Sequence, residues 1–378
     1  MASGTGPRLP TVDFTFSAEQ DALRAVARSF LAAEAPSAYV RSMLDDHRGV
    51  TEGFWAKAVA LGWPGLLIAE DHGGAGLGLL DAVVVCEETG ALPLPGPWFS
   101  SAVCGTLLAS RLGDASVLDD LAAGRARATV AVEEGGARDP LDSIQCTARA
   151  ERVGWVLDGV KPLVLDGHTA DVVYVVARDD AGLAAFAVDQ PSSEPVPSLD
   201  VTRKMARLVL DATPARRVGP AGDQRALLAR VVDDIGVALC AESVGACDRA
   251  LEMAAEYAKA RVQFGRPIAT FQVIKHKIVD MLHQLELARV ATHYAAWASD
   301  VDDPQRESAA ALCKGFVAEA AAMITGENIQ VHGGLGFTWD VDCHLLFRRV
   351  KANDVLFGRQ GHQRQRLADL LLGPVEGH

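Results

Sequence analysis

The sequence lacks the features of a nucleic-acid-binding protein, a nucleotide hydrolase and a zinc protein. It has 36 Lys and Arg against 49 Asp and Glu, a formal net charge of −13, whereas binding to a phosphate backbone requires a basic face. No G-x-x-x-x-G-K-[ST] segment occurs, so the P-loop that cradles nucleotide phosphates is absent. No G-x-S-x-G segment supports a serine nucleophile, and the ten histidines show no spacing typical of metal ligands.

Signals for disulfides, secretion and membrane insertion are also missing. The seven cysteines are an odd number without a C-x-x-C pair. They lie in apolar runs such as VVVCEE, so we expect buried, reduced thiols. The N-terminal MASGTGPRLP has no apolar core after a basic start, and no uninterrupted apolar run is long enough to span a bilayer. These absences predict a soluble, cytoplasmic protein with no membrane partner.

Three segments of different character predict the domain organisation of the 378 residues. Residues 1–124 have helical periodicity, and Ser17 followed by Gln20 is a capping-box start. Residues 125–222 contain short β-branched runs separated by turn residues, which predicts a small β domain. Residues 223–378 return to long helical patterns. The order is helices, strands, helices without βαβ alternation, so we expect a mostly helical α+β fold rather than a doubly wound nucleotide fold.

Turn signals predict some of the element boundaries. Asp158-Gly159 between apolar flanks is typical of a β-hairpin turn. The run LLARVVDDIGVALCAESVGACDRALEMAAEYAKA predicts one long helix. Asp303-Pro304 predicts the start of a later helix, with proline at its first helical position, that reaches about Gln330.

Three polar, glycine-containing stretches interrupt the helical segments. They are DHGGAGLG at 71–78, RVQFGRPIATFQ at 261–272 and NIQVHGGLGFTWD at 328–340. Each alone is most simply a turn between helices. Together they indicate an anionic ligand, because Arg261 and Gln263 supply forked and amide donors that suit a phosphate or pyrophosphate. Gln330 adds an amide, and Gly333-Gly334 would let the backbone approach a ligand closely.

The motifs R-x-x-F-G-x-x-I at 261–268 and Q-x-H-G-G-x-G-F at 330–337, with the order of the three segments, resemble the acyl-CoA dehydrogenase family of flavoproteins. The resemblance covers nearly the whole chain, including FWAKAVALGWPGLLIAEDHGGAGLG at 54–78. It implies a helical N-terminal domain, a small β-barrel-like domain and a C-terminal four-helix bundle. It also implies α,β-dehydrogenation of an acyl-CoA thioester, in which a glutamate takes the α-proton, FAD takes the β-hydride, and an electron-transfer flavoprotein receives the electrons.

The resemblance assigns a role to the polar stretches. In this family the matching residues hold the pyrophosphate and adenosine end of FAD across a dimer interface, on the FAD seated in the neighbouring subunit. The residues of this chain that match are Arg261, Gln263, Phe264, Gln272, Gln330, Gly333 and Gly334.

The chain departs from the family pattern where the catalytic base should be. Family members carry aromatic-Glu-Gly-Thr, with Glu as the base; here Phe357 stands in place of that Glu and Arg359 in place of the Thr. Phenylalanine cannot accept a proton, so no usual base is present. Some members place the base on the preceding long helix, but the matching position is near Ile235, which is also apolar.

Two flavin-contacting segments of the family are also changed. The Thr of the usual Thr-Glu-Pro is replaced by Glu133, whose carboxylate would oppose flavin reduction by like-charge repulsion. The usual Trp-Ile-Thr or Trp-Ile-Ser becomes Leu163-Val164-Leu165. Groups that would serve the chain's own flavin are therefore changed, whereas groups that would serve a neighbour's FAD remain. This division fits a non-catalytic subunit paired with a catalytic acyl-CoA dehydrogenase subunit in a two-plus-two assembly.

The ending HGGLGFTWDVDCHLLFRR resembles the base-lacking subunits of actinobacterial steroid side-chain dehydrogenases, which implies a steroid acyl-CoA substrate. Two other interpretations stay open. The chain could be a self-sufficient homotetrameric dehydrogenase with a relocated base, for which Glu242, Asp233 and Asp234 are the candidate carboxylates. It could also be a flavin-free protein that binds acyl-CoA or serves as a scaffold.

Overall fold

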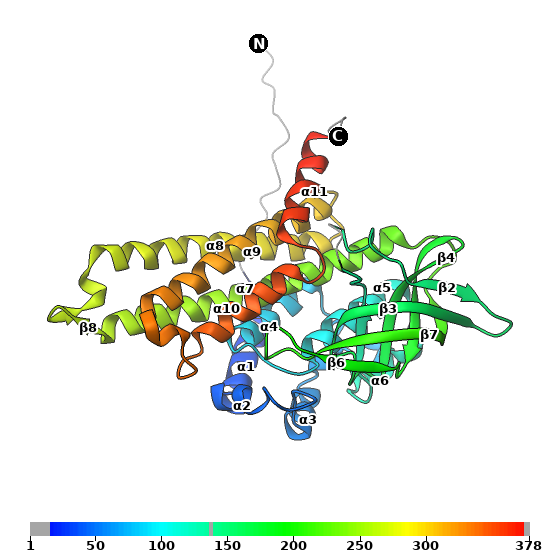
Figure 1. Cartoon of the computed structure of the whole chain (residues 1–378), viewed down its shortest axis with the longest axis horizontal. Coiled ribbons are helices and arrows are strands. Elements are labelled where there is room, and N and C mark those ends of the chain that lie inside the picture. Colours follow the sequence, from blue (N-terminus) through cyan, green and yellow to red (C-terminus); the bar gives the residue numbers. More distant parts are fainter. Residues whose placement is uncertain (1–15, 136–138, 374–378) are drawn as a thin grey trace, which may run out of the picture.

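The computed structural model describes residues 16–135 and 139–373, which form a helical N-terminal part, a small β-barrel and a C-terminal group of long helices (Figure 1). In α1, the Ser17 hydroxyl accepts from the Gln20 backbone and the Gln20 amide oxygen accepts from the Ser17 backbone, so the predicted capping box is confirmed. The N-terminal helices are α1 (Ala18–Glu34), α2 (Ser37–Ser42), α3 (Glu52–Ala60), α4 (Leu79–Ala91), the π-helix η3 (Trp98–Gly105), α5 (Thr106–Leu112) and α6 (Ala115–Ala122).

The strands close into a barrel because β5 pairs with both β4 and β7, which completes the ring β4-β2-β3-β7-β5. Side chains such as Leu157, Val173 and Phe186 fill the interior of this barrel and are fully buried. The strands are β1 (Ala128–Ala131), β2 (Thr147–Ala150), β3 (Trp155–Leu165), β4 (Val172–Asp179), β5 (Gly182–Asp189), β6 (Ser193–Val196) and β7 (Met205–Val218).

The hairpin turn predicted at Asp158-Gly159 is wrong, because both residues lie inside strand β3. Gly159 has φ +141° at a register shift between β3 and β7, and a Cβ there would lie 2.4 Å from the Cys146 sulfur. The glycine therefore permits a bulge and a close approach to the chain before β2. The β2–β3 turn lies earlier, where the Glu151 N–H donates to the Gly154 carbonyl.

The C-terminal part contains α7 (Arg225–Ala260), α8 (Gln272–Asp300), α9 (Arg306–His332), α10 (Cys343–Val355) and α11 (Gln360–Leu372). The single long helix predicted for α7 is confirmed. The predicted position of Pro304 is wrong by two residues: it lies in the turn before α9, because α8 runs on to Asp300 and a tight turn with Asp302 at φ +52° follows.

Helix α9 is the core of the C-terminal part. Within the described residues, the stretch 306–337 is the only helix with the length and mean hydropathy of a membrane span, and 67% of its most apolar window is buried inside the protein. Its apolar character is thus used for packing between α7, α8, α10 and α11. All seven cysteines are buried and free, as their apolar surroundings predicted.

Candidate cofactor site

The stretch 261–272 forms a hairpin at one tip of the molecule, at the end of α7 (Figure 1). Strands β8 (Val262–Gln263) and β9 (Arg266–Pro267) pair through a turn in which Phe264 and Gly265 both have positive φ, +52° and +76°. Two left-handed residues are what a tight two-residue hairpin requires. The turn leaves the Phe264 side chain 91% exposed, so its ring is available to another molecule.

Most of the polar side chains in the hairpin and at Gln330 make no hydrogen bond within the described residues. Arg261, Gln263 and Gln330 are exposed, and their side chains make no hydrogen bond to any residue of 16–135 or 139–373. Gln272, also exposed, has its amide nitrogen 3.5 Å from the His276 ring. An exposed guanidinium and exposed amides are available to an external anion.

The structure brings the two C-terminal motifs to the same end of the helices. The Tyr257 ring near the end of α7 stacks on the His332 ring at the end of α9, with centroids 4.3 Å apart. Beyond His332 the chain turns at Gly333, where φ is +60°. A Cβ added at Gly333 or Gly334 would meet no atom within 4 Å, so this turn faces open space that a ligand can enter.

Aromatic surface adjoins this turn. A cavity of about 380 Å³ beside Gln330 is lined by Phe337 and Trp339, which are 74% and 53% exposed. The third polar stretch, 71–78, is used differently: it packs on the segment before it, with Gly74 so close to Ile68 that a Cβ would lie 2.0 Å from the Ile68 carbonyl oxygen. That stretch is a packing loop, and the structure does not bring it to the other two.

The positions that depart from the family pattern form a contact of their own. The Phe357 backbone N–H donates to the Glu133 carboxylate at 2.8 Å. Phe357 is buried and has φ +55°. Burial raises the pKa of Glu133, although the Phe357 N–H and the charges of Lys314, Lys161 and Arg359 oppose that rise. Sequence reasoning missed Lys314, which is 3% exposed; its signal was a lone lysine in the apolar run AALCKGFV.

Each candidate for a relocated base is paired with arginine. Glu242 is buried between Arg203 and Arg349, with its carboxylate 3.4 Å from the Arg349 guanidinium. The other two candidates are paired in the same way: Asp233 lies 2.5 Å from Arg366, and Asp234 lies 2.8 Å from Arg111. Within the folded chain each of these carboxylates therefore already has a guanidinium as its partner.

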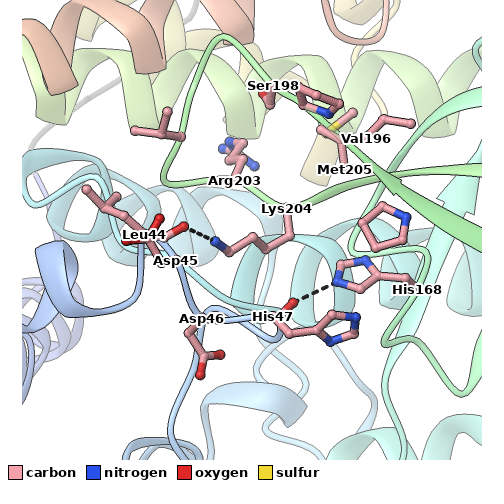
Figure 2. A pocket seen from close by; sticks show the side chains of 13 residues that line it. Leu44, Asp45, Asp46, His47, His168, Val196, Ser198, Arg203, Lys204 and Met205 are labelled. Atoms are coloured by element: carbon pink, nitrogen blue, oxygen red, sulfur yellow. Dashed lines mark hydrogen bonds between the residues drawn. The ribbon is translucent and has the colours of Figure 1, made fainter.

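A separate cavity of about 340 Å³ lies between the N-terminal part and the barrel (Figure 2). The Lys204 ammonium crosses it to donate to the Leu44 carbonyl at 2.5 Å, and the His168 ring donates to the His47 carbonyl at 2.8 Å. Its polar groups tie the loop after α2 to the barrel.

Comparison with known proteins identifies the family. The N-terminal domain of acyl-CoA dehydrogenases matches residues 17–117, and their C-terminal domain matches residues 236–372. The acyl-CoA dehydrogenase IpdE2 of Mycolicibacterium smegmatis is 30% identical over 93% of this chain and 98% of its own length. The chain belongs to the acyl-CoA dehydrogenase family. Members of this family are oxidoreductases that act on CH–CH groups and use FAD, and the predicted fold is confirmed.

Two solved structures are similar over almost the whole chain. A variant of the steroid acyl-CoA dehydrogenase Tcur3481-Tcur3483 has a TM-score of 0.86 and 30% identity, and covers 94% of this chain and 98% of its own. The ChsE4-ChsE5 complex of Mycobacterium tuberculosis has a TM-score of 0.87, covering 96% of this chain and all of its own; its 24% identity shows the fold alone.

Two regions of this chain differ in how well they suit FAD. One is the hairpin with the Gly333-Gly334 turn, and the other is the contact between Glu133 and Phe357. The hairpin and the Gly333-Gly334 turn have free donors and open space, which suit a dinucleotide. At Glu133 and Phe357 the polar groups already bind each other. The first region therefore suits an anionic dinucleotide, whereas the second presents a carboxylate that already accepts a hydrogen bond.

Proposed function

We propose that this chain is the non-catalytic subunit of a heteromeric, FAD-dependent acyl-CoA dehydrogenase. One observation carries the proposal. The exposed side chains of Arg261, Gln263 and Gln330 make no hydrogen bond within the described chain, while the place of the usual base holds a buried phenylalanine. The relative Tcur3481-Tcur3483, which is named by two chains, supports a mixed assembly, for which we propose two copies of each subunit in the cytoplasm.

In this assembly the chain's residues would complete the partner's cofactor site. The Arg261 guanidinium and the Gln263 and Gln330 amides would donate to pyrophosphate oxygens, and the Gly333-Gly334 backbone would approach them closely. Phe264 and Gln272 would cover the adenosine end. When bound, FAD supplies a hydride acceptor for the β-hydrogen of an acyl-CoA, and a partner carboxylate would take the α-proton.

The substrate and the electron acceptor are also part of the proposal. One solved relative is a steroid acyl-CoA dehydrogenase, which supports a steroid side-chain CoA ester as the substrate here. We further propose that an electron-transfer flavoprotein receives the electrons.

Replacing Arg261 by alanine tests the role of the tip. A charge-assisted hydrogen bond contributes about 1.5–3 kcal/mol, so the co-purified assembly should bind FAD about ten-fold or more weakly in Arg261→Ala, measured by flavin absorbance per polypeptide. Arg261 is exposed, so the fold should survive. The matched control is Arg152→Ala, which removes an exposed arginine from the β2–β3 turn.

Unchanged FAD affinity in Arg261→Ala would contradict the proposal. Expression of the chain alone separates the other two interpretations. A yellow homo-oligomer that reduces a dye with acyl-CoA would support a self-sufficient enzyme, and acyl-CoA binding by a colourless chain without a partner would support a flavin-free binding protein.

A further inference from the structure

Three departures from the family pattern meet in one place. Glu133 follows strand β1, whereas Phe357 and Arg359 lie between α10 and α11, 224 and 226 positions further along the chain. The Phe357 N–H is 2.8 Å from the Glu133 carboxylate. Burial raises the pKa of that carboxyl, and the charge of Arg359 is among those that oppose the rise. Changes at separate sites by chance would not be expected to complement one another.

Several groups surround the Glu133 carboxylate that accepts this hydrogen bond. Moving a carboxylate away from water without partners costs several kcal/mol. Here Glu133 is partly buried. Burial raises the pKa of its carboxyl, and the Phe357 N–H together with the charges of Lys314 on α9, Lys161 on β3 and Arg359 before α11 opposes that rise. Lys314 is itself anchored by donating to the Asn353 carbonyl.

The backbone conformation at Phe357 and Gly358 directs the Phe357 N–H toward the Glu133 carboxylate. Phe357 has φ +55° and Gly358 has φ +99°, a pair of left-handed conformations that only the glycine adopts without strain. A Cβ at Gly358 would lie 2.8 Å from the Gln363 amide, so the turn is also closely packed. The turn points the Phe357 N–H at Glu133 while the phenyl ring packs into the main core.

We propose that Glu133, Phe357 and Arg359 form a plug that closes this chain's own flavin seat, so that FAD binds only on the partner subunit. The plug rests on the proposed function. It adds the structural feature that determines which of two similar flavin sites, one in each subunit, binds FAD. A flavin entering this seat would have to break the Glu133 contact, and the negative charge that it gains on reduction would lie near a carboxylate.

Hydrogen exchange at Phe357 tests the plug directly. In the purified wild-type assembly, the Phe357 amide should exchange slowly, and added FAD should leave that rate unchanged. In Glu133→Ala the rate should rise about ten-fold or more, the effect of losing a charge-assisted hydrogen bond, and saturating FAD should now slow it again while flavin per assembly increases. Glu133→Gln retains an oxygen acceptor of the same size, so it should stay slow and exclude flavin.

Three outcomes would overturn the plug. They are a wild-type Phe357 amide that FAD protects, an amide that exchanges equally slowly in Glu133→Ala, and a faster amide in Glu133→Ala without any gain of flavin. The proposed function is tested separately, at the 261–272 hairpin. If it is wrong, Arg261→Ala leaves the flavin of the partner subunit unchanged, while the Phe357 exchange rates still report on the plug.

Discussion

Lys161 carries a positive charge with no exposed surface in the middle of strand β3. Its ammonium donates to the Val132 carbonyl at 3.0 Å and to the Glu134 carboxylate at 2.5 Å. Burial lowers the pKa of Lys161, and the neighbouring Glu134 carboxylate opposes that fall. The pair therefore fixes the chain just beyond β1, on which Glu133 is presented.

Replacing Lys161 by methionine should destabilise the protein strongly. Glu134 would lose its partner while its side chain stays 6% exposed, and breaking a buried pair on one side costs about 3–5 kcal/mol. Urea unfolding would measure the loss. The double variant Lys161→Met/Glu134→Gln should recover most of it, because no unpaired charge remains; a double variant as unstable as the single one would refute this account.

The ion pair between Asp200 and Arg349 predicts a pH dependence. Burial alone would raise the pKa of Asp200, but attraction to Arg349 and Arg203 outweighs it and lowers the pKa below its usual value. The ionised form thus favours the folded state above the unfolded pKa of about 3.9. This stability is lost as the pH falls through the lower folded pKa.

Asp200→Asn should reveal that contribution. At pH 7 the variant should be less stable than the wild type by about 3–5 kcal/mol, since buried Arg349 loses its 2.5 Å partner. The difference in unfolding free energy should shrink as the pH falls below about 4, measured by urea unfolding across this range. A difference that does not depend on pH would show that Asp200 acts by shape alone.

At the scale of elements, helix α8 has an apolar face that no part of residues 16–135 or 139–373 covers. Val279, Leu282 and Val290 are 59%, 46% and 53% exposed. The structure buries Met281 and Leu285 of this helix and leaves Leu282 outside. A helix that is apolar on both sides is expected to pack against a second chain.

Leu282→Lys should therefore weaken assembly without unfolding the chain. A lysine at a covered apolar contact would be desolvated, so the mass measured by light scattering should fall toward that of smaller species, with the helical circular dichroism retained. The matched control is Leu61→Lys, a leucine after α3 that is 42% exposed. An unchanged mass for Leu282→Lys would show that α8 faces solvent.

Elements with a strong period were predictable, and those that depend on one turn signal were not. The period of α7 and the capping box of α1 were sufficient because helices are stabilised by neighbours in sequence. Asp158-Gly159 was misleading because a glycine with positive φ serves a bulge as well as a turn. The barrel environment decides between them, and it is built from strands far apart in sequence.

At the scale of the whole molecule, the sequence alone determined the three segments, the buried state of the cysteines and the chemistry of the two C-terminal motifs. Periodicity and residue type carry that information locally. Only the tertiary structure decided that these motifs share one end of the helices and that Arg366, Arg111 and Arg203 hold the acidic candidates for a base. It also placed Phe357 on Glu133. Such contacts join residues that no local pattern connects, because they arise from how whole helices and strands pack against one another.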